Sequence, residues 1–526
     1  MPLPHAERVA IIGGGCTGIT CFWALQNSGH DVHLFEASAT LGGRIKAIPY
    51  EHNKNRVEVN TESPLFNVET SPNLVSLLSH LGIVTSAAPC HFSASDGDNT
   101  FQWCGSFLKS ILLSPWVLFN IETCRLLVDL IWLKCWALDA LISKSWVWAF
   151  SSSDSHASLS THEYLSNEGY SSTFYDNYLA PLLSTLWKTN AGRFLPQLPF
   201  DALMHCLNDH QILYPRRVAP KWQRINMGVN QFIKTMTREF PPEKIHLKTE
   251  VREISPFGKK RYSLLTSSGE QMYYDRVVFA VDNQEIMRLL HPKLSVEERE
   301  IIQNFKTAQN IAVLHSDSLL SPSVSRSWPA HNYIIAQSSL KQHHYSSTFD
   351  PASGKSSLTH NVNTLQGVST CLFGRVFITL NPFTPPHPHL VQRVWEFTDS
   401  EPSPEFLYAQ ARLPTIQNRH GLSYGIRWTG RGFLEDSITA GLEIAFDHLG
   451  AKLPFEVDHR HALDSSPLSL DLGMTEHLVR LVLISVRICF QLLELGLILL
   501  GAPGLVSPKT RTLAKRWNKD RTFDLN

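Results

Sequence analysis

The sequence predicts an α/β fold: a Rossmann-type domain interleaved with an α+β domain and followed by a C-terminal hydrophobic helix. Three observations predict it. Residues 8–36 read as strand, glycine-rich turn, helix and second strand, the start of a βαβ unit. Residues 244–254 and 273–283 read as two further strands around a polar hairpin. The chain of 526 residues is too long for one core, so a second domain is expected.

Composition argues against several functional classes. The 47 basic and 47 acidic residues cancel, so no overall field favours nucleic acid. The nine cysteines are scattered without a C-x-x-C pair, and the histidines of residues 341–361 lack metal-ligand spacing. We therefore expect reduced thiols and no metal site. The glycine turn begins before a signal peptide could fit, so the N-terminal domain is expected on the cytosolic side.

The turn between the first two strands has the spacing of a dinucleotide-binding turn, Gly13-x-Gly15-x-x-Gly18. Gly13 tightens the turn, Gly15 lets the backbone approach a pyrophosphate, and Gly18 lets helix and strand pack closely. Glu36 follows Gly13 by 23 residues, about where a carboxylate holds the ribose hydroxyls. Because that carboxylate would repel a 2′-phosphate, FAD and NAD remain and NADP is disfavoured.

A second glycine pair follows, in Leu41-Gly42-Gly43-Arg44. This stretch resembles the FAD signature of the flavin-containing amine oxidase superfamily. The resemblance implies that FAD is the cofactor and that Gly43 and Arg44 help to hold its phosphates. It also implies that Val251, in the first of the later strands, lies over the adenine.

Residues 428–442, WTGRGFLEDSITAGL, are similar to the closing motif of the same superfamily. In that motif a glycine turn, an acidic residue and a helix N-terminus meet the flavin end of the cofactor. The resemblance therefore implies that Glu435 and Asp436 bind the cofactor. Acidic residues at a helix start are favoured equally by capping alone, so a purely structural role is the alternative.

A longer match is to a subgroup of predicted NAD/FAD-binding proteins in this superfamily, FAD-dependent oxidoreductases associated with cyclopropane-fatty-acid synthases. The matching stretches keep their order from about residue 8 to residue 450: FNVETSPNLVSLLSHLGI (66–83), HEYLSNEGYSSTFYDNYLAPLLSTLW (162–187), KWQRINMGVNQFI (221–233), AVLHSDSLL (312–320), VFITLNP (376–382) and WTGRGFLED (428–436).

The chain departs from this family at three places. Asn60-Thr61-Glu62 stands where the family has D-T-G, so a different loop geometry is expected beside the flavin. Met227-Gly228 stands where the family has a pair of glycines, so only one of the two is kept. Ile426 stands where the family has a further glycine. No cysteine stands where monoamine oxidases attach their flavin, so noncovalent FAD is expected.

The resemblance also divides the chain into an FAD-binding domain (1–84, 221–285 and 415–454), a substrate domain (85–220 and 286–414) and a C-terminal extension (455–526). The apolar stretch 107–150 predicts an amphipathic helix with Glu122, Arg125 and Asp129 on one face, more easily explained by core packing than by a substrate channel or a bilayer. Ser160 and Glu163 predict a capping box at the start of the next helix.

The C-terminal extension predicts a hydrophobic helix over 481–506, long enough to cross a bilayer. Its polar residues fall on one helical face, which suits the membrane interface better than a span: Arg480, Arg487, Gln491 and Glu494. A basic tail after it suits an anionic cytosolic surface. We therefore expect association with a membrane surface, by an interfacial or a spanning helix; docking of the helix on the flavoprotein is the alternative.

Three residues are candidates for the catalytic site. Trp187 and Trp428 are expected to shape the space beside the flavin ring, and His210 is a candidate acid or base. Each has a structural alternative, since buried tryptophans and single histidines usually belong to the core.

The predicted function is an FAD-dependent oxidoreductase that acts on an apolar small molecule, a lipid or a specialised metabolite of a biosynthetic pathway. The single dinucleotide fingerprint favours an oxidase, with oxygen as electron acceptor, over a reductase with a second nucleotide site. An amine oxidase proper, a redox-neutral desaturase or isomerase, and a non-catalytic membrane-associated module stabilised by FAD remain as alternatives.

Overall fold

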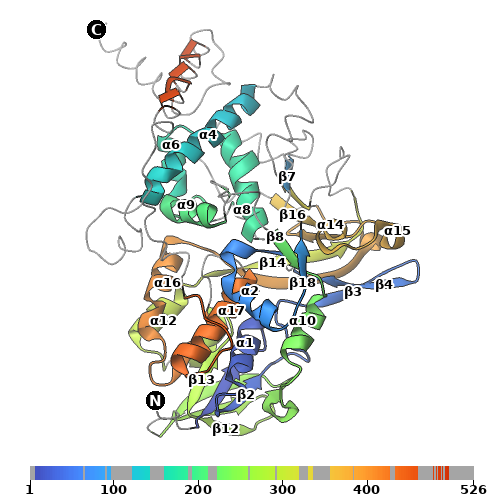
Figure 1. The fold of residues 1–526 in the computed structure, drawn as a ribbon, viewed down its shortest axis with the longest axis vertical. Helices are drawn as coiled ribbons and strands as arrows, with labels where there is room; N and C mark the ends of the chain where they lie inside the picture. The colour runs from blue at the N-terminus through green and yellow to red at the C-terminus, as the bar shows by residue number, and fades with distance from the viewer. Residues whose placement is uncertain are drawn as a thin grey trace.

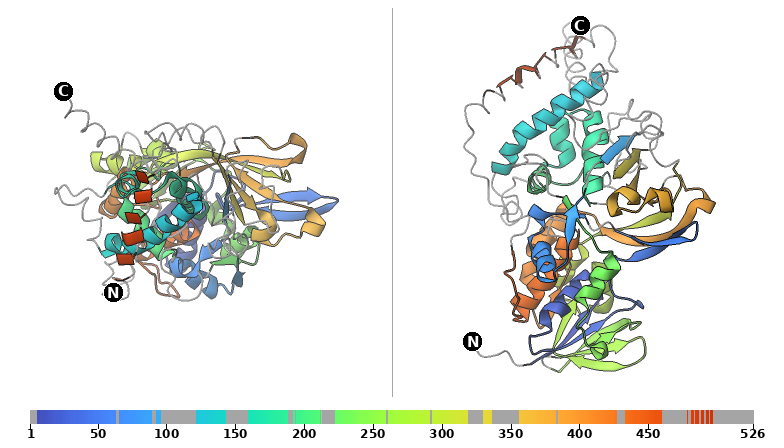
Figure 2. Two further views of the ribbon diagram at one scale, coloured as in Figure 1. Left: turned by 90° about the horizontal axis from the view of Figure 1, so that it is seen from above. Right: turned by 45° about the vertical axis from the view of Figure 1, so that its right-hand side comes forward.

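The computed structural model in Figures 1 and 2 describes most of the chain. The described residues are 6–62, 65–88, 92–95, 121–142, 159–187, 192, 194–210, 212, 222–258, 261–290, 293–318, 330–335, 356–382, 384–426, 433–459 and parts of 478–496. They form a lower part with a parallel sheet, a middle part with a larger sheet, and an upper layer of helices (Figure 1).

A parallel sheet of five strands organises the lower part. Its order is β19-β13-β1-β2-β9, and its strands are β1 (Arg8–Ile12), β2 (Asp31–Phe35), β9 (Ile245–His246), β13 (Arg276–Phe279) and β19 (Leu422–Tyr424). The last four residues of β1 are buried, as expected for a parallel strand covered on both faces. The sheet thus joins three stretches of sequence that lie hundreds of residues apart.

Helix α1 (Cys16–Leu25) packs on this sheet at a distance that only glycine permits. A Cβ atom built on Gly18 would lie 1.9 Å from the carbonyl oxygen of Gly13. On its other side α1 packs against α17 (Phe433–Glu443), where a Cβ on Gly441 would lie 2.7 Å from the Thr17 carbonyl oxygen. The two glycines therefore fix the start of α1 between β1 and α17.

The later strands differ from the prediction in their boundaries. The stretch 244–254 divides into β9 and β10 (Val251–Phe257), and 273–283 divides into β12 (Gln271–Tyr274) and β13. Lys248, with a φ of 53°, lies at the first break. Strand β11 (Arg261–Thr266) joins β10 and β12 in a separate antiparallel sheet. This sheet packs beside helices α11 (Asn283–Leu290), α12 (Val296–Gln303) and α16 (Pro404–Ile416).

A mixed sheet of six strands forms the middle part, in the order β18-β14-β17-β16-β15-β7. Its strands are β7 (Phe92–Ser95), β14 (Thr307–His315), β15 (His331–Ile335), β16 (Ser356–Asn361), β17 (Phe377–Leu380) and β18 (Val391–Ser400). All pairs are antiparallel except β15 with β7. The hairpin of β3 (Ala47–His52) and β4 (Asn55–Asn60) shares this sheet's core, because Tyr50 and Val59 pack with Leu314.

Shorter elements connect these parts. They are the small sheet β5 (Leu65–Asn67), β8 (Trp222–Ile225) and β6 (Thr85–Ala87), and the helices α2 (Pro72–His80), α10 (Val229–Met236), α14 (Val362–Gln366) and α15 (Thr370–Phe373).

The upper layer of helices has the packed core that the sequence favours. It contains α4 (Ile121–Ile142), α6 (Thr161–Asn167), α7 (Ser172–Phe174), α8 (Ala180–Trp187) and α9 (Phe200–Asp209). Leu126 and Leu133 of α4 are 1% exposed. The predicted capping box of Ser160 and Glu163 is confirmed at the start of α6. Asp129, predicted on a polar face, is instead buried and accepts hydrogen bonds from the backbone N–H and hydroxyl of Ser171, at 2.9 and 2.6 Å.

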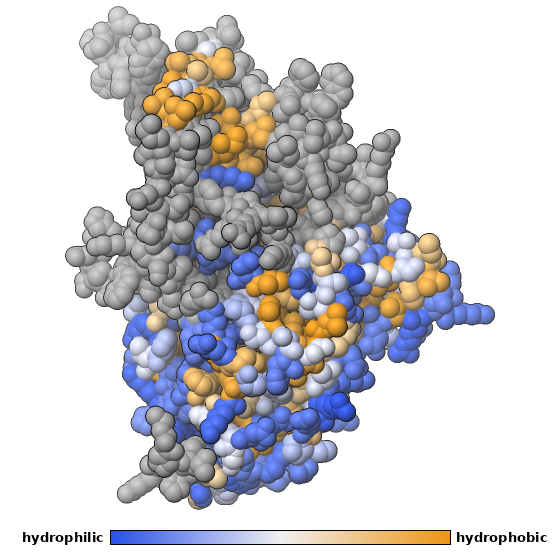
Figure 3. Space-filling view, viewed as in Figure 1, coloured by the Kyte–Doolittle hydropathy of each residue, from blue (hydrophilic) through white to orange (hydrophobic). Residues whose placement is uncertain are grey.

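The C-terminal extension is described only in part. Within the described residues, no helix is both long enough and apolar enough to cross a membrane. The described positions of 478–496 are helical and carry seven exposed large apolar side chains: Leu478, Leu481, Val482, Ile484, Ile488, Leu492 and Leu493. They contribute to an apolar patch at the upper end of the molecule in Figure 3. The basic tail lies outside the described residues, so membrane association stays a prediction.

Replacing Asp129 with Ala should loosen α7 locally. The variant leaves two buried donors of Ser171 without this acceptor, which costs about 1–3 kcal/mol. Hydrogen exchange of the Ser171 and Phe174 amides should report that loss in the free energy of local opening. Glu239→Ala, at an exposed position, is the control; equal protection in both variants would contradict the role of Asp129.

Candidate functional site

A cavity of about 400 Å³ opens at the carboxyl ends of the parallel strands. Its lining includes the residue that directly follows each of four strands: Gly13 after β1, Glu36 after β2, Ala280 after β13 and Gly425 after β19. Open α/β sheets bind their ligands at this edge. The position of the cavity is therefore that of a dinucleotide site.

The first glycine turn gives the cavity a bare stretch of backbone. Gly13 has a φ of 105°, and a Cβ on it would lie 2.5 Å from the Ala280 carbonyl oxygen. A Cβ on Gly15, in contrast, would meet no atom within 4 Å, because this residue borders the cavity. Gly15 is also the N-cap of α1 and has no side chain to cover the helix N-terminus. The turn thus leaves room for a phosphate beside a positive helix end.

Glu36 lies beside the same turn. Its carboxylate accepts hydrogen bonds from the backbone N–H groups of Gly14, at 2.7 Å, and Ser38, at 2.8 Å. These bonds hold an anionic group in the cavity wall, at the end of β2. The placement agrees with the predicted ribose contact, which itself stays a prediction.

The second glycine pair packs directly on the first turn. The Gly42 N–H donates to the Gly14 carbonyl oxygen at 2.8 Å. Gly43 has a φ of 58°, and a Cβ on it would lie 2.9 Å from the Gly15 Cα. Contact between the two turns thus requires glycine here.

The Arg44 side chain is held by two carboxylates at the edge of the cavity. Its Nε donates to Glu62 at 2.6 Å and its Nη1 donates to Asp399 at 2.5 Å. A second bond from Nη1 reaches the Thr398 carbonyl oxygen at 2.9 Å, and the guanidinium lies 5.1 Å from the Phe397 ring centroid. Glu62 stands where the related family has the glycine of its D-T-G motif. The residue that differs from the family is therefore one of the two carboxylates that bind Arg44. The predicted phosphate contact of Arg44 stays a prediction.

The remainder of the wall contains aromatic and acidic side chains. Trp187 at the end of α8 and Phe194 line the cavity with ring centroids 5.3 Å apart. Trp187 is 4% exposed, so its ring is fixed by packing, and its role beside the flavin ring stays a prediction. Asp436 lines the cavity as well, near the start of α17.

Two predicted cofactor residues have other positions. Glu435 accepts hydrogen bonds from the backbone N–H groups of Asn73, at 3.0 Å, and Leu74, at 2.7 Å. Its carboxylate therefore caps the N-terminus of α2, and the prediction that it binds the cofactor is corrected to a structural role. Val251 is 3% exposed in a core cluster and is not among the residues that line the cavity.

The structure favours the structural alternative for His210. Its ring is buried, lies parallel to the Trp222 ring and places Nδ1 3.3 Å from the Thr70 hydroxyl. Burial lowers the pKa of His210 to about 4, so the ring is neutral at physiological pH. Since His210 lines neither this cavity nor the one described next, it is a core residue. Trp428 lies outside the described residues.

A second cavity, of about 440 Å³, adjoins the first and shares four lining residues with it: Gly43, Arg44, Glu62 and Thr398. Eight apolar residues from the hairpin, the six-stranded sheet and α14 form much of its wall: Ile48, Ala312, Val362, Leu365, Ile378, Leu380, Trp395 and Phe397. These residues are spread over some 350 positions of sequence, and no motif marks them.

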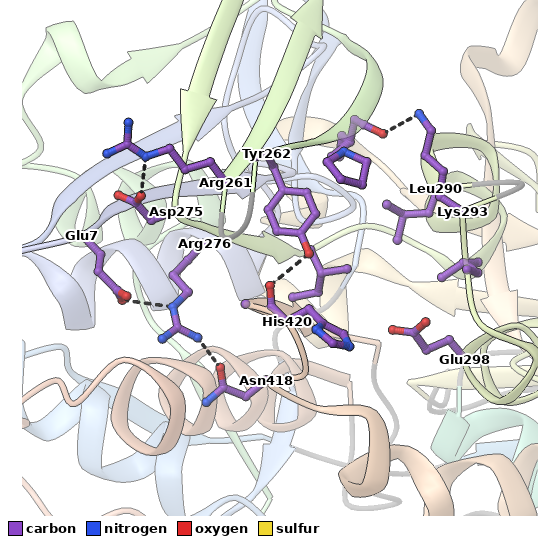
Figure 4. Close-up of a pocket in the computed structure, with 16 residues that line it drawn as sticks. Glu7, Arg261, Tyr262, Asp275, Arg276, Leu290, Lys293, Glu298, Asn418 and His420 are labelled. Atoms are coloured by element: carbon purple, nitrogen blue, oxygen red, sulfur yellow. Dashed lines mark hydrogen bonds and ion pairs between the residues drawn. The ribbon is translucent and has the colours of Figure 1, made fainter.

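A cleft of about 580 Å³ lies at the opposite edge of the parallel sheet, where β1, β13 and β19 begin (Figure 4). Four of its charged side chains pair with one another: Arg261 with Asp275 at 2.9 Å, and Arg276 with Glu7 at 3.0 Å. This cleft is a network of ion pairs at the amino ends of the strands, so it is not the dinucleotide site.

The residues around the first cavity fit FAD. Bare backbone at Gly15 and the N-terminus of α1 suit its diphosphate, and Glu36 is placed for its ribose. Among the described residues no group of three or more histidine, cysteine, aspartate or glutamate side chains could hold a metal ion.

Replacing Gly15 with Val should weaken FAD binding without unfolding the turn, because the new side chain enters the cavity and meets no protein atom at its Cβ. Overpacking of this kind costs about 1–3 kcal/mol, or about 5- to 150-fold in Kd. Titration of flavin-free protein with FAD measures the loss. Asn27→Val, at an exposed position just beyond the end of α1, is the control. Equal affinity in the two variants would contradict the assigned turn.

Comparisons with known proteins agree with this site. Residues 11–81 match the model of the NAD(P)-binding Rossmann-like domain, and residues 141–316 match that of the flavin containing amine oxidoreductases. No curated protein matches the chain.

Several solved structures share the fold. A fatty acid isomerase from P. acnes has a TM-score of 0.55 at 11% identity over 84% of this chain and 98% of its own. Cyclohexylamine oxidase from Brevibacterium oxydans IH-35A has a TM-score of 0.54 at 13% identity over 84% and 99%. Wild-type putrescine oxidase bound to putrescine has a TM-score of 0.56 at 13% identity over 84% and 98%.

The glycine turns, the cavity at the carboxyl edge of the sheet and the two family matches agree on one assignment. The matches over residues 11–81 and 141–316 support the flavin-containing amine oxidase superfamily, and with it an FAD-dependent oxidoreductase.

Proposed function

We propose that the chain oxidises an apolar small molecule, a lipid or a specialised metabolite, bound in the cavity next to the flavin cavity. The observation that carries this proposal is the shared wall: Gly43, Arg44, Glu62 and Thr398 border both cavities. A ligand in the second cavity therefore lies against the cofactor site.

The second cavity suits an apolar ligand. Its volume of about 440 Å³ lies within the range of about 300–1,000 Å³ typical of small-molecule sites. Ile378 and Leu380 of β17 and Leu365 of α14 are at most 7% exposed, so packing holds the wall in place. Each Å² of apolar ligand surface removed from water contributes about 25 cal/mol.

Bound FAD supplies the acceptor for a hydride from a substrate C–H bond. The apolar residues that line the second cavity then orient the substrate and keep water away from the reacting carbon. The single dinucleotide fingerprint supports oxygen, not a second nucleotide, as the next electron acceptor.

The charges around the second cavity favour this function over amine oxidation. Putrescine oxidase and cyclohexylamine oxidase share the fold, and their names place an amine in their sites. Here, however, the lining holds three cations, Arg44, Lys46 and Arg393, against two carboxylates, Glu62 and Glu396, and Glu62 is already paired with Arg44. An ammonium group would meet a lining with an excess of positive charge. A redox-neutral isomerase, as in the fatty acid isomerase that shares the fold, is separated from an oxidase by the test below.

Anaerobic mixing of the FAD-loaded protein with fatty acyl compounds, polyketides and amines tests the proposal by bleaching of the flavin. We expect an apolar compound to reduce the flavin and admission of oxygen to release peroxide. Conversion of substrate without peroxide would indicate an isomerase, and reduction by amines alone would overturn the proposal.

Ile48→Trp should raise the KM of the substrate about tenfold or more while FAD stays bound, since the larger ring fills the half-buried wall of β3. The control is Ile311→Trp, at an exposed position of β14. The substrate cavity would be wrongly assigned if both variants kept the KM of the parent protein.

We propose in addition that the C-terminal helix docks on an anionic membrane surface. Seven large apolar side chains of 478–496 are exposed, and residues 509–521 hold six basic residues and one acidic residue. An apolar helix face beside a basic segment is the pattern of interfacial helices.

The double variant Leu481→Glu/Leu492→Glu should lose cosedimentation with vesicles that contain phosphatidylserine, because both leucines are more than 60% exposed and no core is disturbed. The parent protein should bind phosphatidylserine vesicles better than phosphatidylcholine vesicles, and Val296→Glu should behave like the parent. The proposal would be contradicted if the double variant cosedimented as well as the parent protein and if both kinds of vesicle bound the protein equally.

A further inference from the structure

Arg393 places a cation on the wall of the apolar cavity. It lies on β18, where Arg393, Trp395 and Phe397 alternate and all line the cavity. Alternate residues of a strand share one face, so the guanidinium belongs to the same surface as the two aromatic rings. Register pairs join Arg393 to Leu314, Leu314 to Ile378, and Ile378 to His360. Within this row the polar lining residues Arg393 and His360 lie on either side of Leu314 and Ile378.

This row lies at the end of the cavity remote from the flavin site. The junction of the two cavities is near Thr398, where Arg44 binds the Thr398 carbonyl oxygen at 2.9 Å. Five residues back along β18, at about 3.3 Å per residue, Arg393 is roughly 16 Å from that junction. The neighbouring strand β3 runs alongside, since the Gln392 side chain bonds the Glu51 backbone at 3.0 and 2.6 Å.

The charged groups of the lining leave Arg393 available. Glu62 and Asp399 hold Arg44 at the junction. Lys46 follows Arg44 by two residues and so lies toward the junction. Glu396 alternates with Arg393, Trp395 and Phe397 along β18, so its side chain belongs to the other face of the strand. Within the described part of the chain, Arg393 forms no ion pair, and it is exposed at the rim.

We infer that the substrate is an apolar chain with a terminal carboxylate, which Arg393 binds while the reacting carbon lies at the junction with the flavin cavity. This inference rests on the proposed function and narrows its substrate class. A planar guanidinium pairs with a carboxylate through two parallel hydrogen bonds, a geometry that an alcohol or an ammonium group cannot reproduce. The distance along β18 places the oxidised carbon roughly 16 Å from the carboxylate.

Three ligands of equal chain length test the head group: tetradecanoate, tetradecanol and tetradecylamine, each below its micellar concentration, whose extended chains are long enough to reach from Arg393 to the junction. Their binding to the FAD-loaded full chain is measured by the change in flavin absorbance. Tetradecanoate should bind about tenfold tighter than tetradecanol, with tetradecylamine weakest. Arg393→Gln should remove the preference for tetradecanoate and leave tetradecanol unchanged. Arg238→Gln, at an exposed position on another part of the surface, should keep the preference.

The outcomes separate this inference from the proposed function. Equal binding of the three ligands, or an equal loss of all three in Arg393→Gln, would overturn the carboxylate site and leave an apolar substrate cavity. If Ile48→Trp bound all three ligands as tightly as the parent protein does, the ligands would lie elsewhere. The proposed function would then fail as well.

Discussion

The whole site depends on how closely α1 approaches the first strand. A Cβ on Gly18 would lie 1.9 Å from the Gly13 carbonyl oxygen, so any other residue would force helix and strand apart. Because they stay together, the N-terminus of α1 lies at the carboxyl edge of the sheet with the bare backbone of Gly15 beside it. Gly441 allows the same close approach between α17 and the other side of α1. Gly43 likewise allows the second glycine turn to pack against the first.

The Arg44 cluster joins this cofactor site to the apolar cavity. One guanidinium pairs with Glu62 and Asp399, so the wall between the two cavities carries one cation and two carboxylates. The Arg44 side chain is 34% exposed and that of Asp399 is 2% exposed, so part of the network lies out of water, where removal of one partner is costly. The cluster thus links Arg44 and Glu62, near the start of the chain, to Asp399 at the end of β18.

The sequence predicted those parts of the site that short-range geometry specifies. The first strand, the turn, α1 and the second strand lie within 28 residues, and the position of Glu36 follows from their spacing. The capping box of Ser160 and Glu163 is equally local. Long-range contacts decide the rest. Glu435 looks like a cofactor ligand until α2 is seen to place two backbone N–H groups against its carboxylate, 361 residues away in sequence.

The dependence on long-range contacts also explains which site residues could not be predicted from the sequence. Asp399 and Arg393 are ordinary charges in a strand until the six-stranded sheet brings them beside residues 44–48, and the apolar cavity is built from residues that no local pattern connects. Asp129 reads as part of a solvated helix face because Ser171, its partner, lies 42 residues further on.

A crystal structure of the chain with bound FAD tests the central claim most directly. We expect the diphosphate beside the backbone of Gly15, in contact with the N-terminus of α1, and the flavin end at the wall that Arg44 and Glu62 share with the apolar cavity. Flavin density anywhere else, or a cavity filled by side chains at Gly15, would contradict it.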